Sequence, residues 1–295
     1  MESAKLSPTT ALYTASIASG SNGNCYYIGN EQDAILVDVG ISCRELERRM
    51  QRMGLSMTRV RAIFISHEHT DHIKGLTVVA NKYQLPVFIT EGTLSACRLA
   101  IPGRLIYLLR PDYQVHVGAL EVEAFSKLHD AADPQSFVVR QGTRTVGVFT
   151  DIGAVCDRLI HYFQQCDIAF LETNYDEEML DQGRYPYFLK KRIRGGYGHL
   201  SNHQALELFM QHRNPKLRLL YLCHLSRDNN DPLLVQRLFQ QEAGQTNVVL
   251  ASRDAETAVY RMKEEQKTLE YVEKSVSFID GHILTYQSCV IRWGS

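Results

Sequence analysis

The run His67–His72 places five ligand-type side chains directly after a short apolar segment. The segment RAIFIS (61–66) ends immediately before HEHTDH, in which three histidines, one glutamate and one aspartate occupy six positions. A short apolar run of this kind is typical of a buried strand. His67 and His69 lie two residues apart, so their side chains point the same way in an extended chain and can bind one ion. Asp71 and His72 follow as the chain turns into a helix and can face a second ion; the alternative is a polar helix start with incidental histidines.

Short apolar segments alternate with amphipathic ones along most of the chain. Strand-like segments cover 11–19, 25–29, 34–40, 61–66, 85–90, 167–173, 217–225 and 246–252, helix-like segments cover 41–53, 71–83, 153–163, 202–212 and 232–242, and the middle, 113–150, is rich in strand patterns. This order predicts an α/β (α+β) fold in which two sheets pack face to face with helices outside. We expect one domain over 10–262 and a C-terminal tail of unknown structure over 263–295.

The composition excludes several classes of protein. The 295 residues are 44% hydrophobic, which is enough for a full-sized core. The net charge of −1 excludes a protein that coats nucleic acid through its overall charge, so an anionic substrate must meet a local basic patch. The chain has no run of about 18 apolar residues, and its start lacks the apolar core of a signal peptide, so we expect no membrane contact. The seven cysteines are scattered without a CxxC pair, which predicts unpaired thiols in a reducing cytoplasm.

Three further candidate ligands stand at the ends of apolar segments. His129 follows EVEAFSKL, Asp151 follows VGVFT, and His224 follows LLYLC. Loops gather at such strand ends, so these side chains are expected near the first motif. Each one alone has a simpler interpretation, a capped turn for Asp151 and a hydrogen-bonded histidine for the other two. Together with the first motif they complete the set that two ions need.

The spacing His67-x-His69-x-Asp71-His72, followed by His129, Asp151 and His224, resembles the metallo-β-lactamase superfamily. The resemblance implies a four-layer αββα sandwich with two divalent metal ions at one edge. It implies that His67, His69 and His129 hold one ion, that Asp71, His72 and His224 hold the other, and that Asp151 bridges them. Nitrogen and oxygen ligands without a thiolate suit Zn²⁺, and also Mn²⁺ or Fe²⁺. Water between two such ions becomes acidic, so the expected chemistry is hydrolysis by a bridging hydroxide.

The segment 182–206 bears on the substrate. It carries no acidic residue and five basic ones, which are Arg184, Lys190, Lys191, Arg192 and Arg194. A glycine-rich turn leads to His199, after which Ser201-x-x-Gln204 predicts a capping box and therefore a helix start. Basic side chains next to unpaired helix amides favour phosphate, and we expect Ser201 and Asn202 to contribute there. Four aromatic residues, Tyr185, Tyr187, Phe188 and Tyr197, can stack on bases; the alternative is a solvated helix end with ordinary core aromatics.

Several motifs outside the metal positions resemble the YycJ/WalJ family over about residues 12–262. They include GSNGNCYYIG, ILVDVGIS, LETNYDEEML, YPYFLKKRI, GHLSNHQA and LCHLSRDNN. The resemblance implies a cytoplasmic metal-dependent nuclease with 5′-to-3′ DNA exonuclease activity and links to DNA repair. The GHLSN motif is also similar to the histidine motif of tRNA 3′-processing members of the superfamily. That similarity implies that His199 contacts the scissile phosphate and helps to protonate the leaving oxygen.

Four carboxylates have expected roles beside this histidine. Asp71 is expected to act both as a ligand and as the group that orients the nucleophile. Asp38 ends the segment ILVD and is expected to orient a metal ligand. Asp130 and Glu172 are expected to orient ligands or to hold loops in place.

Three alternative functions share parts of this pattern. A superfamily hydrolase of a small ester, thioester or cyclic phosphodiester would have the same ligands and would differ only in 182–206. A diiron redox protein of the superfamily usually has a carboxylate in place of one histidine and carries a flavin domain, and neither feature is evident. A binding protein with an inactive site would not need the full ligand set. The sequence does not predict the native metal, DNA over RNA, or the oligomeric state.

Overall fold

The computed structural model describes residues 11–110 and 113–263 in full, and beyond them only the backbone of four short strands. Residues Ala11–Met262 form one compact unit. In the C-terminal stretch, β15 (Leu269–Tyr271) pairs with β18 (Cys289–Ile291), and β16 (Ser277–Ile279) pairs with β17 (His282–Leu284), both antiparallel. The side chains of the predicted tail beyond 263 lie outside the described residues. Across the described part of the chain, no helix has the length and apolar character of a membrane span.

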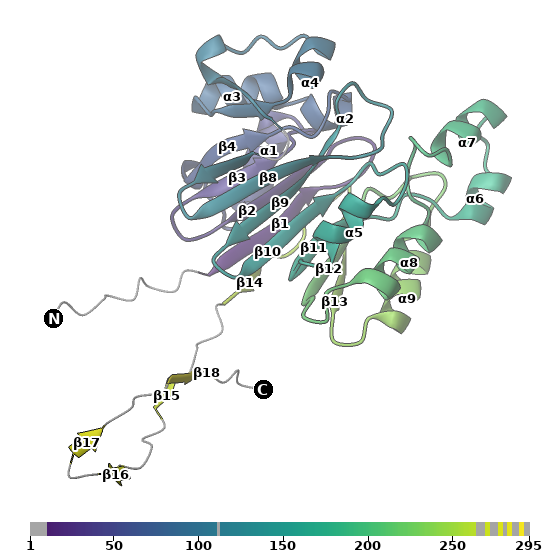
Figure 1. Cartoon of the computed structure of the whole chain (residues 1–295). Helices are drawn as coiled ribbons and strands as arrows, with labels where there is room; N and C mark the ends of the chain where they lie inside the picture. Colours follow the sequence, from purple (N-terminus) through teal and green to yellow (C-terminus); the bar gives the residue numbers. More distant parts are fainter. Residues whose placement is uncertain are drawn as a thin grey trace. The chain divides into compact units, whose positions relative to one another are not determined.

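Two seven-stranded sheets form the centre of the compact unit (Figure 1). The first sheet contains β14 (Tyr260–Met262), β1 (Leu12–Ala18), β2 (Cys25–Gly29), β3 (Ala34–Val37), β4 (Val60–Phe64), β5 (Val87–Ile89) and β6 (Ile106–Leu108), in that spatial order. The second contains β13 (Asn247–Leu250), β12 (Leu219–Cys223), β11 (Ile168–Glu172), β10 (Arg144–Phe149), β9 (Gln135–Gln141), β8 (Leu120–Ser126) and β7 (Gln114–Val117). Strands β3 to β6 are parallel, and so are β10 to β13.

Aromatic side chains join the inner faces of the two sheets. The ring centroids of Tyr26 and Phe170 lie 5.1 Å apart, and those of Phe64 and Phe137 lie 5.8 Å apart, each pair reaching from one sheet to the other. Burial of such large apolar side chains is the main driving force of folding. The two sheets therefore share one central core.

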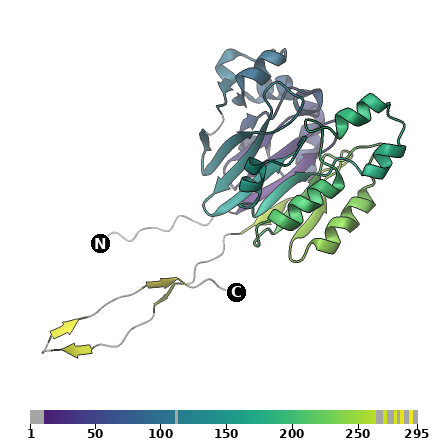
Figure 2. The same ribbon diagram turned by 45° about the vertical axis from the view of Figure 1, so that its right-hand side comes forward.

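Helices cover the outer faces of both sheets (Figure 2). Helices α1 (Cys43–Arg52) and α3 (Leu76–Tyr83) pack on the first sheet, and α5 (Asp157–Phe163), α8 (Asn202–His212) and α9 (Pro232–Glu242) pack on the second. Four shorter helices complete the set: α2 (Thr70–Ile73), α4 (Glu91–Ala96), α6 (Glu177–Gln182) and α7 (Tyr187–Ile193). This arrangement confirms the predicted four-layer αββα sandwich.

Parallel strands bring the candidate ligands to one edge of the sandwich. Asp38 follows β3 and His67 follows β4 in the first sheet, while Asp151 follows β10 and His224 follows β12 in the second. Because neighbouring parallel strands end on the same side, residues far apart in sequence meet at this edge.

The prediction of one helix over 71–83 is wrong, because the chain forms α2 and α3 with a break at Gly75. A Cβ at Gly75 would lie 1.9 Å from the carbonyl oxygen of Ile41, so only glycine permits this close approach. The amide of Gly75 donates to the carbonyl of Val39 at 2.8 Å, a bond that a continuous helix would not make. The helix expected over 153–163 begins only at Asp157, and the short helices α4, α6 and α7 were not predicted.

Candidate metal centre

Three imidazole rings gather at the carboxyl end of β4. His67 Nε2 lies 3.0 Å from His69 Nδ1, and His129 Nε2 lies 3.4 Å from the same atom. Two nitrogens bound to one tetrahedral ion at its usual bond lengths are about 3.3 Å apart, so these separations fit a shared ion. The three rings therefore form one group that could hold a metal.

A second group of ligand atoms lies beside the first. Asp71 Oδ2 is 3.4 Å from both His72 Nε2 and His224 Nε2. Asp151 lies between the groups, because its Oδ2 is 3.2 Å from His72 Nε2 while its Oδ1 is 3.4 Å from His224 Nε2 and 3.9 Å from His129 Nε2. Asp151 Oδ2 is buried and has no hydrogen-bond partner among the described residues. The structure thus brings together all seven residues that the sequence predicted as ligands.

Three site residues adopt the left-handed backbone conformation. Asp38, Asp151 and His224 have φ values of 60°, 57° and 56°; Asp38 and His224 directly follow a strand, and Asp151 lies two residues after the end of β10. For residues other than glycine this conformation costs on the order of 1 kcal/mol or more, and it persists where surrounding contacts hold it. At His224 one such contact is the hydrogen bond from its amide to Ser19 Oγ at 2.8 Å. The sharp turn after each strand aims the side chain at the centre.

Both histidines of the second group donate a hydrogen bond from the ring nitrogen Nδ1 to a buried carboxylate. His72 Nδ1 lies 2.7 Å from Asp38 Oδ2, and His224 Nδ1 lies 3.1 Å from Glu172 Oε1. His129 Nδ1 lies 3.0 Å from the carbonyl oxygen of Gly198. An acceptor at Nδ1 keeps the proton there and leaves Nε2 as a lone-pair donor for a metal.

Burial and charge set the protonation of the ligands. Burial lowers the pKa of His67 well below its ordinary value and lowers the pKa of His129 to about 4, so both rings are neutral near pH 7. Burial also lowers the pKa of His224, but Asp151, Asp71 and Glu172 outweigh it and raise that pKa to about 10. An ion bound to the same carboxylates replaces the proton, so metal binding at this group is expected to release protons.

Comparison with known proteins places the chain in a family. Residues 33–225 match the family model described as Beta-lactamase superfamily domain. The chain is 36% identical to the Exodeoxyribonuclease YycJ of Bacillus anthracis over 222 residues, which are 74% of this chain and 84% of that relative. It belongs to the metallo-β-lactamase superfamily and, within it, to the YycJ/WalJ family. The resemblance stated from the motifs is therefore confirmed.

Two further comparisons agree with this membership. The chain is 33% identical to the Exodeoxyribonuclease WalJ of Streptococcus pneumoniae over 224 residues, which are 72% of this chain and 81% of that relative. The structure resembles the metallo-beta-lactamase fold protein YhfI from Bacillus subtilis with a TM-score of 0.66 and 15% identity, covering 85% of this chain and 99% of that one. At that identity the structural likeness supports the fold alone.

A pocket of about 170 Å³ opens onto the candidate ligands. His199 lines it, and its Nδ1 lies 2.8 Å from Glu172 Oε1 and 4.0 Å from Asp151 Oδ1. Its ring stacks on that of His224 with a centroid separation of 5.3 Å. The predicted residues His199 and Glu172 thus contact each other and the candidate metal ligands of this YycJ/WalJ family member.

The basic segment 182–206 is partly neutralised by acids that lie outside it. Arg192 pairs with Asp130, and Arg194 pairs with Asp181. Lys190 donates to the carbonyl oxygen of Asp181 at 2.7 Å. The segment as a whole is therefore less positive than its own sequence predicted. Asp130 also lies 3.4 Å from His129 Nε2, so the pair with Arg192 stands at the edge of the metal pocket.

The prediction that Ser201 and Asn202 bind phosphate is wrong, because both side chains are fully buried. The predicted capping box is present, with Ser201 Oγ accepting from the amide of Gln204 and the Gln204 side chain accepting from the amide of Ser201. Ser201 also donates to Glu177, and Asn202 exchanges hydrogen bonds with Asn230. The helix start is thus satisfied within the protein and does not face solvent.

Four residues contact the site without having been predicted. Asn24 Nδ2 donates to Asp71 Oδ2 at 3.1 Å, and Asn174 Nδ2 donates to the carbonyl oxygen of His224 at 2.8 Å. Ser66 Oγ donates to Asp38 Oδ2 at 2.7 Å, and the buried Lys127 donates to the carbonyl oxygen of Thr150 at 2.6 Å. The sequence contains only weak indications that these residues belong to the site. Asn24 and Asn174 stand within family motifs, and Lys127 is an isolated lysine at the end of an apolar segment.

Proposed function

We propose that this protein is a phosphodiesterase that uses two divalent metal ions and acts as a DNA exonuclease. The observation that carries the proposal is the pair of ligand groups joined by Asp151 at the floor of one pocket. Relatives whose names describe exodeoxyribonucleases support a nucleic-acid substrate and favour DNA. The fold alone does not indicate which substrate a hydrolase of this superfamily cleaves.

The side chains present fit a pair of divalent ions. The first ion would be held by His67, His69 and His129, the second by Asp71, His72 and His224, and Asp151 would contact both. The unpartnered buried oxygen of Asp151 supports this role, because a buried carboxylate oxygen without a partner is costly unless a cation satisfies it. The donor set of nitrogen and oxygen suits Zn²⁺ or Mn²⁺. When bound, two such ions polarise a phosphate and acidify water.

The protein's own groups orient the reaction. Asp71 reaches the centre from the start of α2 and is held by Asn24, so it is placed to orient the attacking water. Glu172 accepts from Nδ1 of His199 and fixes the ring, which leaves Nε2 to contact the substrate. His199 is thereby placed to donate a proton to the leaving oxygen of the scissile bond.

Helix α7 supplies a surface for the rest of the nucleic acid. Tyr187 and Phe188 are 79% and 73% exposed, and Lys191, at helical spacing from both, is also exposed. Leu189 and Arg192 of the same helix line the metal pocket. Exposed aromatic rings beside a lysine suit a single strand, whose bases stack on rings while its phosphates meet the positive charge.

Cleavage assays test this function. Wild-type protein with Mn²⁺ or Zn²⁺ is incubated with end-labelled single- and double-stranded DNA and RNA, with bis-p-nitrophenyl phosphate, and with a thioester. The expected result is shortening of DNA from an end, hydrolysis of the small phosphodiester, and no reaction with the thioester. The His69→Ala variant, which lacks one ligand, serves as the inactive control. Thioester hydrolysis without cleavage of any nucleic acid would overturn the proposal.

The cellular setting is part of the same proposal. The cysteines that the structure describes are unpaired thiols, which supports a location in the reducing cytoplasm. A DNA exonuclease there would serve in DNA repair. Growth of a deletion strain after DNA damage, compared with a strain that carries the His69→Ala variant, tests this role.

A further inference from the structure

A larger pocket adjoins the metal pocket and has no role in the chemistry described above. It has a volume of about 580 Å³, and Ser21 lines both pockets. Its walls are the loops that follow β1, β12 and β13, together with Tyr185 from the loop between α6 and α7. We call it the side pocket. It lies directly beside the place where a scissile phosphate would bind.

The lining of the side pocket combines an aromatic ring, hydroxyl groups, two guanidinium groups and the two carboxylates of Asp228 and Asp254. The Tyr185 hydroxyl donates to Asp228 Oδ2 at 2.9 Å, which holds the ring in the wall. Arg227 and Arg253 both line the pocket, and Arg227 is exposed. Burial lowers the pKa of Arg253, Asp254 opposes this effect, and the neighbouring positive charge of Arg227 adds to it. The guanidinium groups can contact a phosphate group, and Asp228 and Asp254 balance their charge within the lining.

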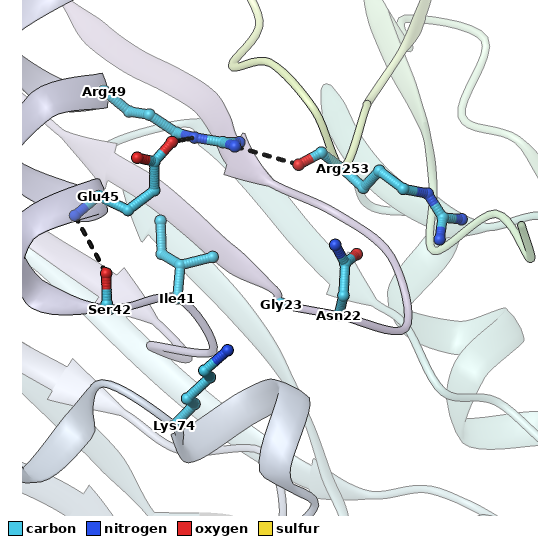
Figure 3. A pocket seen from close by; sticks show the side chains of 8 residues that line it. All are labelled: Asn22, Gly23, Ile41, Ser42, Glu45, Arg49, Lys74 and Arg253. Carbon is cyan, nitrogen blue, oxygen red and sulfur yellow. Dashed lines mark hydrogen bonds and ion pairs between the residues drawn. The ribbon is translucent and has the colours of Figure 1, made fainter.

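Arg253 is one of the residues that line the side pocket. Together with Asn22 it also lines a third pocket of about 190 Å³ at the start of α1, so it stands between the two (Figure 3). Its carbonyl accepts from the buried Arg49 at 3.1 Å, and its guanidinium donates to the carbonyl of Leu225. Figure 3 shows the guanidinium directed away from Ser42 and the third pocket. Arg253 is thus held in place through both its backbone carbonyl and its guanidinium group.

We infer that the side pocket holds the terminal nucleotide of a DNA strand whose adjoining phosphodiester lies at the metal centre. The inference rests on the proposed function and assigns its end specificity to a particular part of the fold. The pocket volume lies within the range of about 300–1,000 Å³ that accommodates a ligand of nucleotide size. Tyr185 stacks on the terminal base, and Arg227 contacts a phosphate. The oxygen of water forms a bond to phosphorus, the P–O bond to one sugar oxygen breaks, and that oxygen leaves as a hydroxyl after it takes a proton. The released nucleotide leaves the pocket, and the next nucleotide of the shortened strand takes its place.

Two variants and a matched control test this pocket. Ser252→Trp fills the side pocket, and Arg227→Ala removes an exposed cation without disturbing a buried contact. Ser56→Trp is the control: Ser252 and Ser56 both accept from the amide two residues ahead, at 3.1 and 3.2 Å, but Ser56 precedes the amino end of β4, away from the site. Turnover is measured on linear single-stranded DNA, on closed circular single-stranded DNA and on bis-p-nitrophenyl phosphate. Thermal unfolding verifies that each variant is folded.

The expected results separate the side pocket from the metal chemistry. The wild type degrades linear DNA and leaves the closed circle intact. The ratio of DNA turnover to bis-p-nitrophenyl phosphate turnover falls about tenfold or more in both Ser252→Trp and Arg227→Ala, as expected for losing a stacked base or a phosphate contact. The ratio in Ser56→Trp equals that of the wild type.

Other outcomes overturn the inference in distinguishable ways. Cleavage of the closed circle as fast as the linear strand, or an unchanged ratio in both pocket variants, overturns the pocket assignment while leaving a nuclease. Hydrolysis of bis-p-nitrophenyl phosphate by the wild type without any cleavage of DNA overturns the nucleic-acid substrate, and the side-pocket assignment with it.

Discussion

The replacement Glu172→Gln changes one atom of a buried carboxylate that links His199 to the candidate metal ligand His224. Glu172 Oε2 accepts from the amides of Ile152 and Leu200 at 2.8 and 3.1 Å, and Oε1 lies 2.8 Å from His199 Nδ1 and 3.1 Å from His224 Nδ1. The residue is fully buried, and although burial raises its pKa, His199 and His224 hold that pKa at about 2. The wild-type side chain is therefore an anion that accepts from four donors.

Glutamine can satisfy only half of these donors. The amides of Ile152 and Leu200 can only donate, so the amide oxygen of glutamine must face them. Its NH₂ group then faces the two imidazole rings and requires each Nδ1 to become an acceptor, which moves the ring proton to Nε2. In His224 that nitrogen is the atom that faces Asp71 and the second ion position. Metal binding would have to reverse this tautomer against the new hydrogen bond.

We expect Glu172→Gln to weaken binding of the second ion about 10- to 100-fold, or roughly 1.4 to 2.7 kcal/mol, which is the usual cost of removing the partner of a ligating histidine. The loss of charge-assisted hydrogen bonds should also destabilise the metal-free protein by about 1–3 kcal/mol. Titration calorimetry with Zn²⁺ measures the affinity, and thermal unfolding in chelator measures the stability. Glu177→Gln is the control, because that exposed carboxylate on α6 accepts from Ser201 and does not touch the ligands. If the Glu172→Gln variant bound two ions with wild-type affinity, the argument that the replacement moves the ring proton of His224 to Nε2 would be refuted.

Three further perturbations have definite expected results. Gly40→Ala should cost about 3 kcal/mol or more, because a Cβ there would lie 1.6 Å from a backbone carbonyl oxygen of α2, whereas Gly103→Ala, with open space around it, should leave the unfolding temperature nearly unchanged. Arg52 lowers the pKa of Glu256 to about 2, so the stability from this pair is present above the unfolded pKa of about 4.3 and is lost as the pH falls through about 2. Arg52→Ala should therefore lower the unfolding temperature clearly at pH 7 and much less at pH 2, and an equal effect at both values would contradict this. His199→Ala should keep its metal content by elemental analysis and lose about 100-fold or more in turnover, and equal turnover would remove the ring from the mechanism.

Local sequence patterns predicted most of the fold and the positions of the candidate ligands. The strand at 61–66, the helix capped by Ser201 and the ligand-type residues at strand ends all follow from periodicity and position. Such features depend on neighbours in the chain, so the sequence displays them directly. The break at Gly75 was missed because it depends on the approach of Ile41, more than 30 residues earlier.

The substrate side of the site shows the limits of the same reasoning. Segment 182–206 contains no acid, yet Asp130 and Asp181 neutralise two of its arginines. A helix-start pattern predicted that Ser201 binds phosphate. The helix does start there, but the Ser201 hydroxyl donates to Glu177 instead. Asp181 directly precedes the segment and is visible in the sequence, whereas the pairing of Arg192 with Asp130, 62 residues earlier, depends on which distant segments meet.

The sequence by itself determined which residues are the candidate ligands of a metal centre, because those residues stand in short motifs next to apolar strands and the strands must be buried. Only the tertiary structure decided how the centre is held and what lies beside it. The carboxylate of Glu172 joins His199 to His224 across strands and helices that are remote in sequence, and three separate loops contribute to the lining of the side pocket. The physical reason is that hydrogen bonds and pocket walls form between parts of the chain that come together only after the two sheets have packed.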